Sequence, residues 1–200
     1  MRVRSEIELK EGSNYLYKSL STNNSLCENK LYLNLGYWKG NPRTLDQAGD
    51  ALAELLAEKA ELKRNDTVLD VGCGFGNQDF YWSKRYGPRE IIGLNSSPEQ
   101  VEEAKKRVGE LNLSEEVSFI LGNATALPFC NSSFDVLLSL EAAFHFNSRE
   151  KFFEEALRVL KPGGRLVLTD VIFSKARFGT VIWLQQLLGS LFWKIPVKNA

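Results

Sequence analysis

The sequence predicts an α/β fold in which helices cover both faces of a doubly wound, mostly parallel sheet. Two observations lead to this prediction. Short apolar runs alternate with amphipathic helical patterns along the chain, and the first apolar run ends in a cluster of glycines. A sheet of this kind binds its ligands at the carboxyl ends of its strands. The 200 residues, 44% of them apolar, suit a single domain with one buried core.

The first 43 residues are predicted to be a loosely ordered lead-in or lid segment, because they are polar and weakly periodic. They also lack the uninterrupted apolar run of a secretory signal. Thr44 and Gln47 have the spacing of a capping box, so a helix is expected to begin there and to cover the sheet with its apolar face. This helix opens the predicted core domain, residues 44–175.

The first two strands and the helix after them have clear signals. TVLDVG is the first predicted strand and runs into a helical segment, and EIIGLN is the second. Ser97 is expected to cap the next helix, with Pro98 at its first position and Gln100 three residues after the cap.

The second half of the core domain continues the alternation. VSFILG and FDVLLSL are the third and fourth predicted strands, and both are apolar enough to be expected in fully buried positions. An apolar stripe from Phe152 predicts a helix that stops at Pro162, before the fifth strand RLVLTDVIF. Strands and helices are therefore expected to alternate throughout.

VLDVGCGFG is the most informative motif of the sequence. Its glycines follow one another as G-x-G-x-G, and their missing side chains let backbone amides approach a ligand at the start of a helix. Dinucleotide sites favour G-x-G-x-x-G, aimed at a pyrophosphate. Asp70, just before the glycines, would repel phosphate but suits a ligand with an ammonium and a sulfonium group. A plain glycine turn is the alternative.

With this motif and the segments around it, residues 35–173 resemble the class I S-adenosylmethionine (SAM)-dependent methyltransferases. The subgroup that the chain resembles methylates small molecules, sterols, quinones and lipids. The resemblance implies a Rossmann-like fold, SAM as cofactor, and O- or C-methylation of a small hydrophobic acceptor. It also implies that the methionine end of SAM lies on the glycine motif, here Asp70, Gly72, Gly74 and Gly76.

The resemblance assigns the remaining cofactor contacts to two loops. GLNSSPEQV carries Asn95 where the family usually has Asp or Glu for the ribose hydroxyls, and Ser96 and Gln100 are expected to assist. Asn can accept and donate one hydrogen bond each, although it binds a diol less firmly than a carboxylate. GNATALPF resembles the adenine loop, with Asn123 and Ala124 at the ring. The alternative is that Asn123 only stabilises a turn.

The fourth strand ends at Leu140, which is expected to contact the cofactor, and is followed by two candidate catalytic residues. Glu141 and His145 lie near the expected position of the acceptor, because strand ends at this sheet edge face the ligand. An imidazole is suited to removing the acceptor proton at neutral pH. The alternatives are a His145 packed between two phenylalanines, and a Glu141 that orients His145, binds substrate or contacts only backbone.

Upstream, NLGYW resembles the family segment that closes over the cofactor. Tyr37 and Trp38 are therefore expected to lie against the sulfonium, since aromatic faces attract cations. The alternative is that these aromatic residues only pin the N-terminal segment to the core.

The end of the chain departs from the family pattern of a cap and two further strands. Residues 176–200 predict one apolar helix, part of a substrate cap, and no strand, so the sheet is expected to lack its last two strands. RLVLTDVIF would then lie near a sheet edge, which indicates a truncated product or a homo-oligomer that covers the edge. The stretch 181–193 is too short for a membrane span but can lie at a membrane surface.

Composition limits the partners and the location. Lys plus Arg equals Asp plus Glu at 25 each, so no overall field recruits nucleic acid. Cys27, Cys73 and Cys130 lack the paired spacing of metal or redox motifs, and His145 is the single histidine. We therefore expect no metal, no disulfide and a cytoplasmic location, with peripheral membrane association as the alternative.

Three other functional classes are alternatives to an active methyltransferase. A noncatalytic or truncated SAM-fold binding module is the main alternative, and it would bind cofactor without turnover. A nucleotide-linked oxidoreductase is disfavoured by the glycine spacing. A nucleic-acid methyltransferase is disfavoured because the sequence has neither a basic stripe nor an Asn-Pro-Pro-aromatic run.

Overall fold

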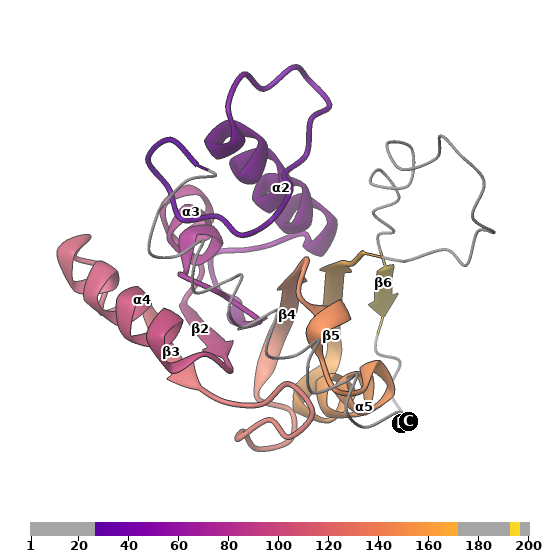
Figure 1. Ribbon diagram of the computed structural model, residues 1–200. Coiled ribbons are helices and arrows are strands. Elements are labelled where there is room, and N and C mark those ends of the chain that lie inside the picture. The colour runs from indigo at the N-terminus through magenta and orange to yellow at the C-terminus, as the bar shows by residue number, and fades with distance from the viewer. Residues whose placement is uncertain (1–26, 172–192, 197–200) are drawn as a thin grey trace, which may run out of the picture.

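The computed structural model describes residues 27–171 and 193–196 and contains a six-stranded sheet in the order β3-β2-β1-β4-β5-β6 (Figure 1). The strands are β1 (Thr67–Val71), β2 (Glu90–Asn95), β3 (Val117–Leu121), β4 (Phe134–Leu140), β5 (Leu160–Thr169) and β6 (Trp193–Pro196). β1 to β5 pair in parallel, and β6 is antiparallel to β5. The predicted α/β, doubly wound, mostly parallel fold is confirmed.

The described helices are α2 (Leu45–Ala60), α3 (Asn77–Tyr86), α4 (Pro98–Glu110) and α5 (Arg149–Val159), with a short 3-10 helix η1 (Ala143–His145). Of these, α2 and α4 begin where their capping residues predict. The Thr44 hydroxyl accepts a hydrogen bond from the Gln47 amide at 3.2 Å, and that of Ser97 accepts one from the Gln100 amide at 3.4 Å. Each bond satisfies an amide that has no partner inside its helix, which fixes the first turn.

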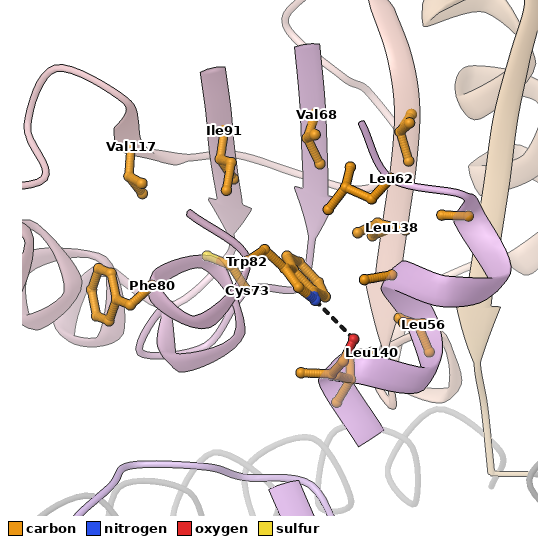
Figure 2. Close-up of a cluster of buried hydrophobic side chains, with 14 of the residues drawn as sticks. Leu56, Leu62, Val68, Cys73, Phe80, Trp82, Ile91, Val117, Leu138 and Leu140 are labelled. Atoms are coloured by element: carbon orange, nitrogen blue, oxygen red, sulfur yellow. Dashed lines mark hydrogen bonds between the residues drawn. The ribbon is translucent and has the colours of Figure 1, made fainter. Parts of the chain in front are cut away.

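The helices α2, α3 and α4 cover one face of the sheet, and α5 covers the other (Figure 1). On the first face, Trp82 of α3 is fully buried between the sheet and α2, and its indole nitrogen donates to the Ala53 carbonyl at 2.8 Å (Figure 2). The indole thus buries a large apolar surface while its one polar group is satisfied. Leu140 lies in the same cluster (Figure 2).

The link between β3 and β4 corrects the prediction that helices alternate with strands throughout, because residues 122–133 contain no helix. Pro128 and the Asn131–Ser133 turn leave too short a run for one. The loop instead packs Leu127 and Phe129 into the second cluster, where the Phe129 ring meets that of Phe134 edge-on at 4.8 Å.

The expectation that the third strand is fully buried is also wrong. Among the described strands, β3 is the outermost and is paired only with β2. Ser118 is exposed and Leu121 is 55% exposed, whereas Val117 and Phe119 face the core. An apolar run by itself does not reveal whether a strand has neighbours on both sides.

At the C-terminal end, the expectation that no strand follows β5 is wrong for residues 193–196. These residues form β6, which pairs with Arg165–Leu168 and so covers that part of the β5 edge. Four residues suffice because the edge of β5 offers a preformed row of backbone donors and acceptors. The rest of the helix predicted over 176–200 lies outside the described residues.

At the N-terminal end, hydrogen bonds to α2 hold residues 27–43 in place, whereas the sequence predicts a loosely ordered lead-in. The Asp46 carboxylate accepts hydrogen bonds from the Asn29 and Lys30 amides, and the Tyr32 hydroxyl donates to Asp50 at 2.7 Å. The first 26 residues of that predicted segment lie outside the described ones. In the described part of the chain, no helix is both long and apolar enough to cross a bilayer.

Candidate functional site

The turn between β1 and α3 has the geometry that its glycines predict. Gly72, Gly74 and Gly76 all have positive φ, at 87°, 56° and 77°. The amides of Gly72 and Cys73 both donate to the carbonyl of Leu94 at the end of β2, at 2.8 and 3.2 Å. The turn is therefore anchored on the neighbouring strand, at the carboxyl edge of the sheet.

Two of these glycines are required by close packing as well as by φ. A Cβ at Gly72 would lie 2.3 Å from the Cβ of Ala142, and one at Gly76 would lie 2.4 Å from the Phe119 ring. At Gly74, the nearest atom to a Cβ would be Cδ1 of Leu33, at 3.6 Å. The turn thus presents bare backbone in a confined space, which fits the amino acid end of SAM.

Asp70 lies beneath this turn and is fully buried. Its Oδ2 accepts a hydrogen bond from Gln78 Nε2 at 2.8 Å, and the same nitrogen donates to the Cys73 carbonyl at 3.0 Å. Burial raises the pKa of Asp70 to about 7, against the hydrogen bonds from Gln78 and Asp79. Asp70 therefore reaches the turn through Gln78, and its carboxylate does not open onto the surface.

At the end of β2, the predicted ribose residues form a linked pair. Asn95 Nδ2 donates to Gln100 Oε1 at 2.5 Å, and Ser96 beside them is exposed. This bond leaves the Asn95 oxygen as an acceptor and the Gln100 nitrogen as a donor, which suits a pair of hydroxyl groups.

After β3, the geometry favours the turn role of Asn123. Its Oδ1 accepts from both the amide and the hydroxyl of Thr125, each at 2.9 Å, so its side-chain nitrogen is the group left for a ligand. That nitrogen is a hydrogen-bond donor. Ala124 beside it is 7% exposed.

Glu141 follows β4 in a left-handed conformation, with φ at 47°. Its amide donates to the carbonyl and to the hydroxyl of Thr169, and its Oε2 accepts from the Leu35 amide at 2.8 Å. Burial raises its pKa, and the charge of Asp170 adds to the shift while the Leu35 amide opposes it. A non-glycine residue at this φ costs free energy, and such strain is frequent at functional sites.

His145 lies in η1, four residues further, and is exposed as a whole residue. Its ring lies against that of Phe144, with centroids 3.9 Å apart, whereas Phe146 turns away and packs on Phe152. Burial of the imidazole lowers the pKa of His145, and the charge of Asp170 opposes the shift. A neutral ring of this kind can accept a proton at neutral pH.

Asp170 is a charged residue of this region that the sequence did not reveal. It follows β5, is 5% exposed, and pairs with the Arg149 guanidinium at 2.7 Å. Its charge acts on both Glu141 and His145. The signal was its place at the end of the fifth strand, at the same sheet edge as Glu141.

The N-terminal segment reaches Glu141 through Leu35, a contact that the sequence did not reveal. Leu35 binds Glu141, and the Trp38 indole donates to the Leu35 carbonyl at 2.8 Å while remaining 48% exposed. Tyr37 packs against the core cluster of α2 and donates its amide to Ala48 at 2.8 Å. Tyr37 therefore pins the segment to the core, and Trp38 supports Leu35.

The glycine turn and the segment that carries Glu141 and His145 are in contact, because Ala142, the neighbour of Glu141, lies against Gly72, with the Phe146 ring next nearest. The glycine turn, Glu141 and the Leu35 segment thus form one continuous region at the carboxyl edge of the sheet. Within the described ranges, no group of three or more His, Cys, Asp or Glu side chains is arranged to hold a metal ion.

Comparison with known proteins relates this region to one enzyme family. Residues 69–168, half of the chain, match the family model described as a methyltransferase domain. The erythromycin 3''-O-methyltransferase of Saccharopolyspora erythraea is 42% identical over 172 residues, which cover 84% of this chain and 56% of that relative.

Two solved structures share the fold. The [4+2]-cyclase SpnF aligns with a TM-score of 0.69 and 30% identity, covering 78% of this chain and 57% of its own. The geranyl diphosphate C-methyltransferase of Streptomyces coelicolor A3(2), in complex with S-adenosylhomocysteine (SAH), aligns with a TM-score of 0.59 and 28% identity, covering 63% and 47%. The chain therefore spans about half the length of the relatives it matches.

Proposed function

The chain belongs to the class I SAM-dependent methyltransferases, and on that premise we propose that the protein methylates a hydroxyl oxygen of a small hydrophobic molecule. The relative at 42% identity is named for O-methylation of erythromycin, whereas the C-methyltransferase structure is 28% identical. We therefore favour oxygen over carbon as the nucleophile. The acceptor class is a hydroxyl-bearing natural product of the erythromycin kind.

The observation that carries the proposal is the contact between Gly72 and Ala142. It joins the turn expected to hold the cofactor to the segment that bears Glu141 and His145. SAM supplies a methyl group on a cationic sulfur, so the protein has only to align an acceptor oxygen with it and to take up a proton.

On the cofactor side of the site, three groups of residues bind different parts of SAM. The bare backbone of the glycine turn receives the amino acid end, with the Asp70 charge beneath it. The Asn95 oxygen and the Gln100 nitrogen bind the ribose hydroxyls. The backbone at Ala124, with the side-chain nitrogen of Asn123, borders the adenine ring. The geometry of each group supports its assignment.

The acceptor side positions the hydroxyl and takes its proton. His145, whose pKa is lowered by burial, accepts the proton as the bond from oxygen to carbon forms. Glu141 holds the Leu35 amide and so keeps the segment of Leu35 and Trp38 over the acceptor. An apolar surface for a hydrophobic acceptor is provided by Leu35, which is 49% exposed, and Trp38, which is 48% exposed.

Binding and transfer assays together test this function. We expect the purified chain to bind SAH with micromolar affinity in calorimetry and not to bind NAD. It should transfer labelled methyl from SAM to a hydroxylated acceptor and not to the matched deoxy compound. A folded chain that binds no SAH contradicts the proposal, and equal labelling of the deoxy acceptor contradicts oxygen as the nucleophile.

A second candidate is a member of the fold that binds the cofactor without transferring its methyl group. The likeness to SpnF, a protein named as a [4+2]-cyclase, supports this alternative. SAH binding together with no labelled product from any hydroxylated acceptor would favour it.

The cellular location and the oligomeric state of the protein are each proposed from a single observation. Cys27, Cys73 and Cys130 are free thiols, which favours a reducing compartment such as the cytoplasm. A homo-oligomer is less needed to cover β5, since β6 pairs with part of its edge. Light scattering tests the oligomer, and vesicle cosedimentation tests the proposed peripheral membrane contact and access to a lipid acceptor.

A further inference from the structure

Asp70 and Asp79 form a pair of buried carboxyl groups beneath the glycine turn. Asp70 belongs to β1 and Asp79 to the first turn of α3, and both are fully buried. Oδ1 of Asp70 and both carboxyl oxygens of Asp79 have no hydrogen-bond partner of ordinary geometry, although the Asp79 backbone amide is near enough to oppose the rise of the Asp79 pKa. Two carboxylates in this state would be costly, so the pair requires a proton or a cation.

The groups around the pair do not supply a positive charge. Among the described residues, no lysine or arginine forms an ion pair with either aspartate. Arg107 of α4 is turned to the Asn77 side chain at 2.6 Å, and Glu54 of α2 is bound to the Tyr81 hydroxyl. The Cys73 thiol is buried beside the pair, and β2 and β3 contribute apolar side chains. A proton is the remaining partner.

We propose that Asp79 keeps this proton and donates it to Asp70, so that one negative charge lies beneath the glycine turn and attracts the ammonium group of the cofactor. The inference rests on the proposed function, because it takes the turn as the cofactor site. Gln78 connects the charge to the turn through its bonds to Asp70 and to the Cys73 carbonyl. Asp79 is therefore a positioning residue, which acts through Asp70.

The directions of the pKa shifts agree with this arrangement. Burial raises the pKa of Asp70 to about 7, while burial and the Asp70 charge raise that of Asp79 well above its usual value. Burial and both aspartates also raise the pKa of the Cys73 thiol, which therefore stays neutral. As the pH rises through about 7, Asp70 loses its proton and Asp79 keeps its own. Cofactor affinity should therefore rise with pH in this range.

Calorimetric titration with SAH as a function of pH tests the pair. For the wild-type chain we expect affinity to rise about tenfold between pH ~6 and pH ~8, as a charge appears near the ligand ammonium. Asp70→Asn should give lower affinity and a flat profile. Asp79→Asn keeps a hydrogen-bond donor to Asp70, so the pH midpoint of its SAH-affinity profile should stay at or below that of the wild type. Asp79→Leu removes the donor and should raise this midpoint by about one pH unit or more.

The possible outcomes distinguish a failure of the proposed function from a failure of the proposed role of Asp79. No SAH binding by a folded chain at any pH would overturn the proposed function. Binding with a flat wild-type profile, or with the same midpoint in Asp79→Leu as in the wild type, would overturn the role of Asp79 alone. Each variant is compared by circular dichroism to establish that it is folded.

A measurement on the wild-type chain avoids any folding defect of the variants. In a protein labelled with carboxyl-¹³C aspartate, one resonance should titrate near pH ~7, and a second should keep the shift of a protonated acid through that range. Asp79→Asn should remove the second resonance. Titration of every aspartate below pH ~5 would overturn the proposal.

Discussion

The two halves of the site are built in different ways. The cofactor side, which comprises the glycine turn, Asp70 and Asn95, is buried or half-buried, and it is held by bonds to Gln78 and to Leu94 of the neighbouring strand. The acceptor side, which comprises Leu35, Trp38 and the Glu141–His145 segment, is half-exposed and joined by a bond that spans 106 positions. The first half is thus formed mainly by one stretch of the sequence, whereas the second brings together segments that are distant in the sequence.

This contrast predicts that substitutions on the cofactor side cost stability and binding together, whereas substitutions on the acceptor side cost turnover with little loss of stability. Substitutions in each half test that separation.

Gly72→Ala should have the largest effect. The new Cβ combines a positive φ with a contact at 2.3 Å to Ala142, so we expect a loss of about 3 kcal/mol of unfolding free energy and at least tenfold weaker SAH binding. Urea unfolding and calorimetry measure the two effects.

Gly163→Ala is the matched control for that substitution, because Gly163 has a φ of 78° and a Cβ added there would meet no atom within 4 Å. It should cost only about 1 kcal/mol and leave SAH affinity unchanged. Equal losses in the two variants would mean that backbone strain alone, and not the contact between the two halves, fixes the turn.

Glu141 should separate stability from turnover. Both Glu141→Gly and Glu141→Ala lose the bond to Leu35, but glycine adopts the φ of 47° without strain. We therefore expect the glycine variant to be more stable than the alanine variant by about 1 kcal/mol. Both should lose methyl transfer by about tenfold or more. A glycine variant with wild-type activity would remove Glu141 from the acceptor side.

His145→Asn should change the pH dependence of turnover. The base works when neutral, so kcat at saturating SAM should be full above the His145 pKa and fall as the pH drops through it. Burial lowers that pKa, which places the fall below the usual value of 6.5. The variant should lose about a hundredfold in kcat, together with this acid limb.

Saturating SAM keeps this readout apart from the Asp70 charge, which acts on cofactor affinity. An acid limb that persists in His145→Asn would mean that another group takes the proton. Stability should change little, since His145 is exposed.

The conformation of the glycine turn and the start of α4 could be predicted from the sequence because their signals are local. Gly72 to Gly76 lie within five residues, and Ser97 with Gln100 marks the start of α4 beside Asn95. Such patterns specify φ, caps and strand ends directly. The role of Asp79 was missed, because an aspartate in the first turn of a helix is ordinarily a solvated partner of the helix dipole.

The pairing of Leu35 with Glu141 could not be predicted from the sequence, since it depends on tertiary structure. The same limitation affected the edges of the sheet. Neither the exposure of β3 nor the pairing of β6 with β5 can be read from an apolar run, because each depends on which strand lies alongside.

Trp38→Ala should have the smallest effect and is the most specific probe of the acceptor side. The indole is 48% exposed and supports Leu35 through one hydrogen bond, so unfolding free energy should change by about 0.5 kcal/mol or less. Losing this apolar surface should raise KM for a hydrophobic acceptor by about threefold, with kcat and SAH affinity unchanged. Leu157→Ala on α5 removes a side chain of similar exposure, 47%, outside the proposed site. If it raises KM equally, the effect is not specific to the Leu35 and Trp38 surface, and the acceptor must be bound elsewhere.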